Sequence, residues 1–127
     1  FANTLYRVSV TGAALRDYLE RIVYRRGQQG VHVSGMTIVY DSTAAEGSHL
    51  RSVTMANGAA LDPAAQYRVI LNDFMALGGE GLGFSTNAIR SEPLGIIDLD
   101  ALIAYLRKLP QPVHAPKELR VVQQRGP

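Results

Sequence analysis

The spacing of apolar residues predicts a strand followed at once by a helix near the start of the chain. From Leu5 to Val10, one face carries Tyr6, Val8 and Val10 and the other carries Leu5, Arg7 and Ser9, which is typical of a strand. After the candidate N-cap Thr11, apolar residues recur at helical spacing, and Arg16 and Glu20 lie four residues apart on the polar side. The apolar stripe comprises Leu15, Tyr18, Leu19, Ile22 and Val23. We therefore expect a helix whose polar side carries an exposed Arg16–Glu20 ion pair.

The middle of the chain predicts a pair of strands separated by a polar loop. Residues 31–40 are rich in strand-forming side chains, with an interruption at Ser34-Gly35 that indicates a bulge or bend. Residues 41–48 are small and polar, and a second strand is expected over 50–55. Asn57-Gly58 follows as a turn signal, so the chain reverses direction there.

The second half of the chain predicts a buried strand, a glycine-rich loop and a last helix. Residues 67–72 carry apolar side chains on both faces, which favours a central place in a sheet. The glycines between 78 and 83 exclude a regular helix or strand interior there. We expect the last helix to begin at Asp98, whose carboxylate caps it, and to stop at Pro110, with a short strand over 119–123. Its apolar stripe comprises Leu99, Leu102, Ile103 and Leu106.

Strands that come in runs, and do not alternate strictly with helices, favour an α+β fold with a mixed β-sheet packed with two main helices. The 127 residues, 46% of them apolar, suit one domain spanning 1–127. The absence of cysteine excludes disulfides and thiolate metal sites. A formal charge of +2 gives no argument for a nucleic-acid partner, and no apolar run is long enough to predict a membrane span.

The chain offers few candidates for catalysis. Its three histidines, His32, His49 and His114, stand alone without metal-ligand spacing, so we expect no metal site built from this chain. A serine-nucleophile elbow is also missing. We therefore predict no catalytic residues within this chain.

One segment could instead bind a ligand. Phe74 follows the apolar strand directly, and Glu80 lies in the glycine cluster after it. An aromatic face and a carboxylate could together hold a planar, hydroxylated ligand, the ring by stacking and the acid by accepting hydroxyl protons. The alternative is that Phe74 lies in the core and Glu80 is a solvated turn residue. Composition and spacing alone favour that alternative.

Several segments, taken in order and spacing, resemble the C-terminal domain of the 5'-nucleotidase family. That family includes bacterial UDP-sugar hydrolases, 2',3'-cyclic-nucleotide phosphodiesterase/3'-nucleotidases and animal ecto-5'-nucleotidases. The most specific part is the N-x-F-x-x-x-G-G-[DE]-G pattern that begins at Asn72. The matching segments are 1–5, 10–15 with Leu19-Glu20, 33–36, 39–41, 61–62, 67–69 and 72–81.

The resemblance implies that the chain is most of the substrate-binding domain of a secreted two-domain phosphohydrolase, truncated at its N-terminal side. An N-terminal metallophosphoesterase domain, absent here, would hold two divalent metal ions such as Zn or Mn. This domain would bind the nucleoside or nucleotide. The substrate-binding residues carried over from the motif are Phe74, Gly78, Gly79 and Glu80, with Glu80 in the place of the usual Asp. We thus expect an enzyme of nucleotide catabolism, periplasmic or extracellular, whose isolated domain is inactive.

The chain departs from the family pattern where a second aromatic residue normally completes the base stack, because Gly30 occupies that position. Tyr24 and Tyr40 are the candidates to replace it. The alternatives left open are a 2',3'-cyclic-nucleotide phosphodiesterase/3'-nucleotidase, a thiosulfohydrolase, and a non-catalytic binding or oligomerisation module. A truncated domain should also expose a sheet edge or apolar face, through which it could form a homodimer.

Overall fold

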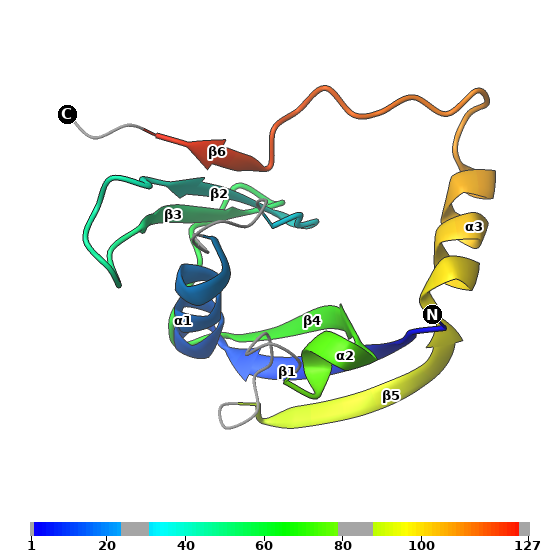
Figure 1. Ribbon diagram of the computed structural model, residues 1–127, viewed down its shortest axis with the longest axis horizontal. Helices are drawn as coiled ribbons and strands as arrows, with labels where there is room; N and C mark the ends of the chain where they lie inside the picture. The colour runs from blue at the N-terminus through cyan, green and yellow to red at the C-terminus, as the bar shows by residue number, and fades with distance from the viewer. Residues whose placement is uncertain (1, 24–30, 79–87, 125–127) are drawn as a thin grey trace. The chain divides into compact units, whose positions relative to one another are not determined.

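The computed structural model describes residues 2–23, 31–78 and 88–124, and these residues form two compact units (Figure 1). The first unit joins the start of the chain to Gln66–Lys117, and the second consists of Gly12–Ala65 with Glu118–Pro127. Both units combine strands and helices, which confirms the α+β class. The strands form two three-stranded sheets, one in each unit, where a single mixed sheet was expected.

The first unit is built around an antiparallel sheet. β1 (Thr4–Thr11) runs between β4 (Gln66–Asn72) and β5 (Arg90–Ile97). Val8 pairs with Val69 on β4 and with Ser91 on β5. Directly paired residues share a sheet face, so the alternation read in the first strand places Val8 on the apolar face and its neighbour Arg7 on the other.

β4 lies at the edge of this sheet, so the prediction that it is central was wrong. It pairs only with β1 among the described residues. The run of apolar residues suggested that both faces were covered, but Ile70 is 52% exposed whereas Leu71 is buried. Only one face of β4 is therefore packed.

β5 has no counterpart among the predicted elements, because Pro93 and Gly95 interrupt its sequence pattern. Proline cannot donate a ladder hydrogen bond and is tolerated at a sheet edge, which is where β5 lies. Gly95 has a φ of 67°, and the register with β1 shifts between Thr4 and Tyr6. The position of β5 at the edge of the sheet thus accommodates Pro93 and Gly95, the two residues that weaken its strand pattern in the sequence.

Two helices follow the outer strands of the first unit. α2 (Asp73–Ala76) continues directly from β4, and α3 (Asp98–Lys108) continues from β5. The expectation that Asp98 is the N-cap of α3 was wrong by one position: Ile97 is the N-cap, and Asp98 accepts a 2.7 Å hydrogen bond from the Leu99 N–H inside the first turn. Within the described residues, no helix combines the length and apolar character needed to cross a bilayer.

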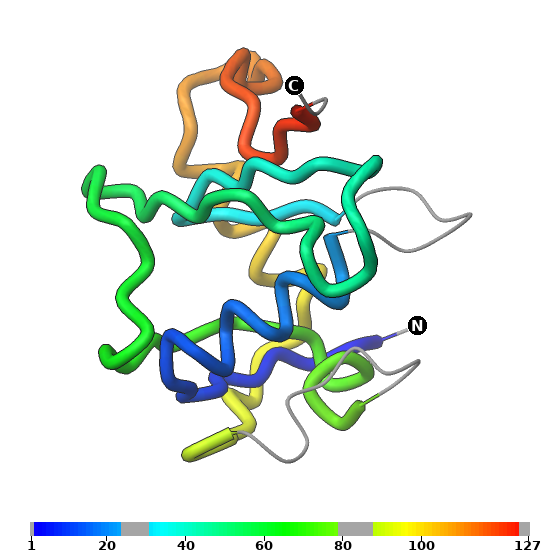
Figure 2. The backbone as a smooth tube through the Cα atoms, turned by 90° about the vertical axis from the view of Figure 1, so that its left-hand side faces the viewer, coloured from blue at the N-terminus to red at the C-terminus, as the bar shows by residue number. Residues whose placement is uncertain are grey.

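The second unit packs one helix on a mixed sheet. α1 (Gly12–Val23) contacts β3 (Leu50–Met55), which pairs antiparallel with β2 (Met36–Tyr40), while β6 (Val121–Gln123) runs parallel to β2. Figure 2 shows the chain turning through residues 41–49 between β2 and β3. The predicted stripe of α1 is buried throughout, together with sheet residues. The core of this unit includes Leu15, Leu19, Ile22, Ile38, Leu50 and Val53.

Candidate functional site

The segment after β4 is shaped by its own polar side chains. Asn72 is the N-cap of α2, and its Oδ1 accepts a 2.8 Å hydrogen bond from the Met75 N–H. Asp73 Oδ1 accepts from the Phe74 N–H at 2.9 Å. Gly78 follows the turn with a φ of 90°, a conformation that glycine adopts without strain. The short helix α2 is therefore fixed at both ends by local interactions.

This turn presents Phe74 at the surface of the first unit. Phe74 is 50% exposed, and α2 has no buried residue. The alternative that Phe74 is a core residue is therefore not what the structure shows. An aromatic side chain that is half-exposed on a capped turn can stack on a planar ligand.

The other predicted site residues are only partly described. Gly78 lies in the turn after α2, whereas Gly79 and Glu80 lie outside the described residues. The predicted pairing of Phe74 with the Glu80 carboxylate therefore stays a prediction. Gly30 and Tyr24 also lie outside the described residues, and Tyr40 ends β2 in the second unit.

The start of α1 is held by close contact with the loop before β4. The Gly12 N–H donates to the Ala65 carbonyl at 2.8 Å, and the Ala13 N–H donates to the Pro63 carbonyl at 3.1 Å. A Cβ at Gly12 would lie 1.8 Å from the Asp62 carbonyl oxygen. Glycine is thus required at this position because backbone meets backbone there.

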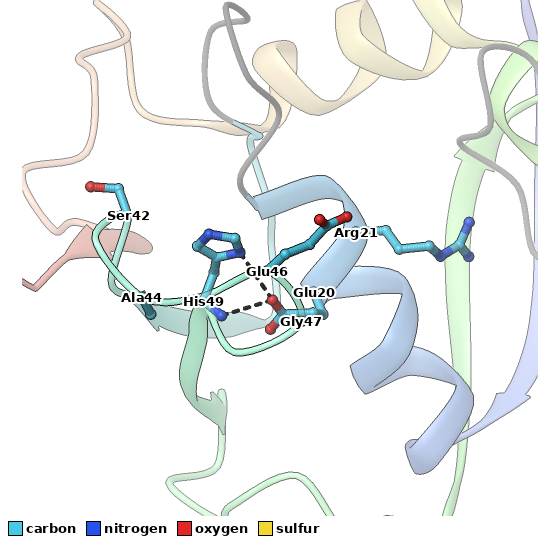
Figure 3. A pocket seen from close by; sticks show the side chains of 7 residues that line it. All are labelled: Glu20, Arg21, Ser42, Ala44, Glu46, Gly47 and His49. Atoms are coloured by element: carbon cyan, nitrogen blue, oxygen red, sulfur yellow. Dashed lines mark hydrogen bonds and ion pairs between the residues drawn. The ribbon is translucent and has the colours of Figure 1, made fainter.

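Glu20 performs a structural task that the helical pattern did not predict. Its Oε1 accepts from the His49 N–H at 2.7 Å and lies 3.2 Å from His49 Nδ1, while its Oε2 accepts from the Leu50 N–H at 2.7 Å (Figure 3). Arg16, the expected ion-pair partner, instead reaches the Leu50 carbonyl at 3.4 Å. The predicted exposed ion pair is therefore wrong. The Glu20 carboxylate is partly buried, and a partly buried carboxylate needs nearby N–H groups to replace the water that it has lost.

A cavity of about 700 Å³ opens beside this contact. Figure 3 shows Glu20 and His49 directed toward each other, whereas Arg21 points away from them. Both Glu20 oxygens already accept backbone N–H groups, from His49 and from Leu50 at the start of β3, so the carboxylate has a structural role. The lining residues are Glu20, Arg21, Ser42, Ala44, Glu46, Gly47 and His49.

The loop that borders this cavity is organised by Asp41, which is buried. Asp41 Oδ1 accepts from the Thr43 N–H at 2.8 Å and from the Thr43 hydroxyl at 2.6 Å. Arg51 donates to Asp41 Oδ2 at 3.1 Å. The hydrogen bonds from Thr43, assisted by Arg51, lower the pKa of the Asp41 carboxyl below its ordinary value.

The polar face of the first unit's sheet carries a second ionic group. Arg7 Nε donates to Glu92 Oε1 at 3.0 Å, and Arg90 donates to Glu92 Oε2 at 3.2 Å. The hydrogen bond from Arg7 is the main cause of a lowered pKa at Glu92, and the charges of Arg90 and Arg68 add to it. This group joins β1 to β5 across the sheet.

Among residues 2–23, 31–78 and 88–124, no three His, Asp or Glu side chains lie close enough together to hold a metal ion. His49 is bonded to Glu20, and neither carboxylate group just described gathers further acids around it. The described side chains therefore do not fit a metal centre.

Comparison with known proteins decides the family. Residues 1–87 match the family described as 5'-nucleotidase, C-terminal domain. This chain belongs to that family. The 5'-nucleotidase precursor of Thermus thermophilus aligns with 99% of the chain at 28% identity and a TM-score of 0.86. The fold of this C-terminal domain is therefore that of a solved 5'-nucleotidase.

The relatives of this 5'-nucleotidase C-terminal domain are much longer proteins. The trifunctional nucleotide phosphoesterase protein YfkN of Bacillus subtilis (strain 168) is 30% identical over 95% of the chain. A snake venom 5'-nucleotidase of Macrovipera lebetinus is 26% identical over 86% of the chain. The chain spans 9% of the first protein, 29% of the second and 26% of the Thermus protein. The domain is thus a small part of each relative.

Proposed function

We propose that this domain recognises the nucleoside of a substrate for a metal-dependent phosphohydrolase of the 5'-nucleotidase type. The observation that carries the proposal is the half-exposed ring of Phe74 on a turn held by the Asn72 cap. Stacking of a base on such a ring contributes about 1–3 kcal/mol. The relatives, a nucleotide phosphoesterase and 5'-nucleotidases, support the same substrate class.

In this proposal Phe74 stacks on the base and Glu80 accepts hydrogen bonds from the ribose hydroxyls, with Gly78 and Gly79 allowing close approach of the ligand. The reaction itself belongs to a metallophosphoesterase domain outside this chain. Residues of that domain would hold two divalent metal ions, such as Zn or Mn, which would supply the means to activate water and polarise the phosphate. The isolated domain is accordingly inactive. The described residues contain no competing metal site.

We also propose that the parent enzyme works in nucleotide catabolism in the periplasm or outside the cell. The similarity to a snake venom 5'-nucleotidase supports an extracellular place of action. The proposed contacts of Phe74 and Glu80 are to the base and the ribose, so they do not select among arrangements of the phosphate. Monophosphates, cyclic phosphates and nucleotide sugars are therefore all substrates to assay with the same parent enzyme.

The test uses the parent enzyme with Phe74→Ala and, as a matched control on the same turn, Leu77→Ala. Leu77 is 72% exposed, so its truncation removes little packing. Loss of about 1–3 kcal/mol of stacking should lower kcat/KM for AMP about 5- to 150-fold. Glycerol phosphate, which lacks a base, should be hydrolysed as before. Equal losses for both substrates, or unchanged AMP hydrolysis, would contradict the proposal.

A further inference from the structure

α3 carries an apolar stripe that the rest of its own unit leaves exposed. Leu99 is 58% exposed and Leu102 51% exposed, and no residue of α3 is buried. Ile103 and Leu106 complete the stripe and are also exposed. Exposing four aliphatic side chains on one side of a helix to water is unfavourable, and covering them lowers the free energy. Leu99, Leu102, Ile103 and Leu106 together form the α3 stripe.

The spacing of the α3 stripe makes it complementary to itself. Its four residues are placed symmetrically about the midpoint between Leu102 and Ile103. When two copies of α3 pair in antiparallel fashion about that midpoint, Leu102 of one copy faces Ile103 of the other, and Leu99 faces Leu106. A twofold axis then relates the copies, as in most homodimers. Each copy therefore supplies the surface that the other needs.

The charges of α3 select the antiparallel arrangement. Asp98 and Asp100 lie in its first turn, and Arg107 and Lys108 lie in its last turn. An antiparallel pair brings each acidic turn beside the partner's basic turn, and it also opposes the helix dipoles. A parallel pair would bring like charges together. Asp100 and Arg107 are two turns apart on the same flank of the stripe, so they can pair between copies.

From this complementarity we propose that the α3 stripe is covered by the α3 stripe of a second copy of this chain in an antiparallel helix pair. The proposal does not depend on nucleoside binding. An 11-residue helix is about 16 Å long, so the contact is small beside a stable interface. The dimer should consequently be weak, so that it forms at high protein concentration and dissociates at low protein concentration.

The first test is sedimentation velocity of the 127-residue chain from micromolar to submillimolar concentration. The wild-type chain should shift from monomer to dimer as its concentration rises. Leu102→Lys, at the centre of the stripe, should raise the dimer dissociation constant at least tenfold. Ala104→Lys places the same charge on the opposite side of the exposed helix, and this control should dimerise as the wild type does.

The second test fixes the orientation. Asp100→Arg and Arg107→Asp should each weaken the dimer about fivefold, because each sets like charges together at two symmetry-related pairs. The double variant restores unlike pairs in an antiparallel dimer and should recover the wild-type dissociation constant. In a parallel dimer the double variant would gain nothing.

Three results would overturn the proposal. A wild-type chain that stays monomeric at every concentration would mean that another part of the polypeptide, or nothing, covers the α3 stripe. A dimer that tolerates Leu102→Lys would place the interface elsewhere. A double variant as weak as the single variants would exclude the antiparallel arrangement. Circular dichroism of each variant checks that the chain keeps the helical content of the wild type.

Discussion

Replacing Gly12 by alanine tests whether the loop at 62–65 fixes the start of α1. Helix propensity by itself favours this change, because alanine stabilises a helix by up to about 1 kcal/mol relative to glycine. The structure predicts the opposite sign. The added Cβ would lie 1.8 Å from the Asp62 carbonyl oxygen and 3.0 Å from Pro63 Cα, and both are backbone atoms that cannot rotate away.

The magnitude follows from two contributions. Relief of the overlap requires a backbone shift, and overpacking of this kind costs about 1–3 kcal/mol. That shift also weakens the hydrogen bonds from the Gly12 and Ala13 N–H groups to the carbonyls of Ala65 and Pro63, each worth about 0.5–1.5 kcal/mol. We therefore expect Gly12→Ala to lower the free energy of unfolding by about 2–5 kcal/mol.

The assay is equilibrium urea denaturation of the wild-type chain, Gly12→Ala and Gly58→Ala. Gly58 has a φ of 87°, and a Cβ there would meet no atom within 4 Å, so the control reports backbone strain alone, about 1–2 kcal/mol. Gly12→Ala should cost more than Gly58→Ala. An alanine variant at position 12 as stable as the wild type, or more stable, would refute the reasoning from close approach.

Three further predictions concern the polar contacts. Glu20→Gln replaces an oxygen that accepts from β3 with an NH₂ group, so it should lower the free energy of unfolding by about 1–3 kcal/mol, while the exposed neighbour variant Asp17→Asn should not. Asn72→Ala removes the cap of α2 and should speed amide exchange at Met75, at a local cost of about 0.5–2 kcal/mol; unchanged exchange there would argue against the cap. The pKa of Asp41 and that of Glu92 are lowered in the folded chain, so the unfolded chain binds protons first as pH falls. The stability that these two carboxylates contribute is fully present above their ordinary pKa values of 3.8 and 4.5, and it is lost as pH falls through the folded pKa values. Urea titrations at stepped pH measure this loss, which Asp41→Asn should reduce.

The elements whose apolar residues recur at regular strand or helix spacing could be predicted from the sequence. The strand over 5–10 and the helix whose stripe begins at Leu15 match β1 and α1, because one face of each is buried and its neighbours are polar. β5 could not be predicted, since Pro93 and Gly95 mask its pattern and only pairing with β1 forms the strand. The exposure of Ile70 likewise could not be predicted, because it depends on which elements pack against β4, and the spacing of apolar residues does not contain that information.

The same distinction applies to the candidate site: its local interactions could be predicted from the sequence, whereas its long-range contacts could not. The N-x-F pattern located the turn that presents Phe74, because the Asn72 cap is a local interaction within three residues. The sequence predicts only a surface ion pair for Glu20, because its acceptor role depends on backbone N–H groups at His49 and Leu50, about thirty residues away. Contacts over that distance leave no regular spacing in the sequence.

The central claim is that Phe74 forms part of a nucleoside pocket, and titration of adenosine into the ¹⁵N-labelled 127-residue chain tests it most directly. The account predicts saturable shifts of the amide signals of Phe74 and its neighbours at millimolar adenosine or below. Phe74→Ala should weaken binding about 5- to 150-fold, equivalent to 1–3 kcal/mol of stacking, while Leu77→Ala binds as the wild type does. Adenosine that produces no shifts around α2, or binds Phe74→Ala as tightly as the wild type, would contradict the claim.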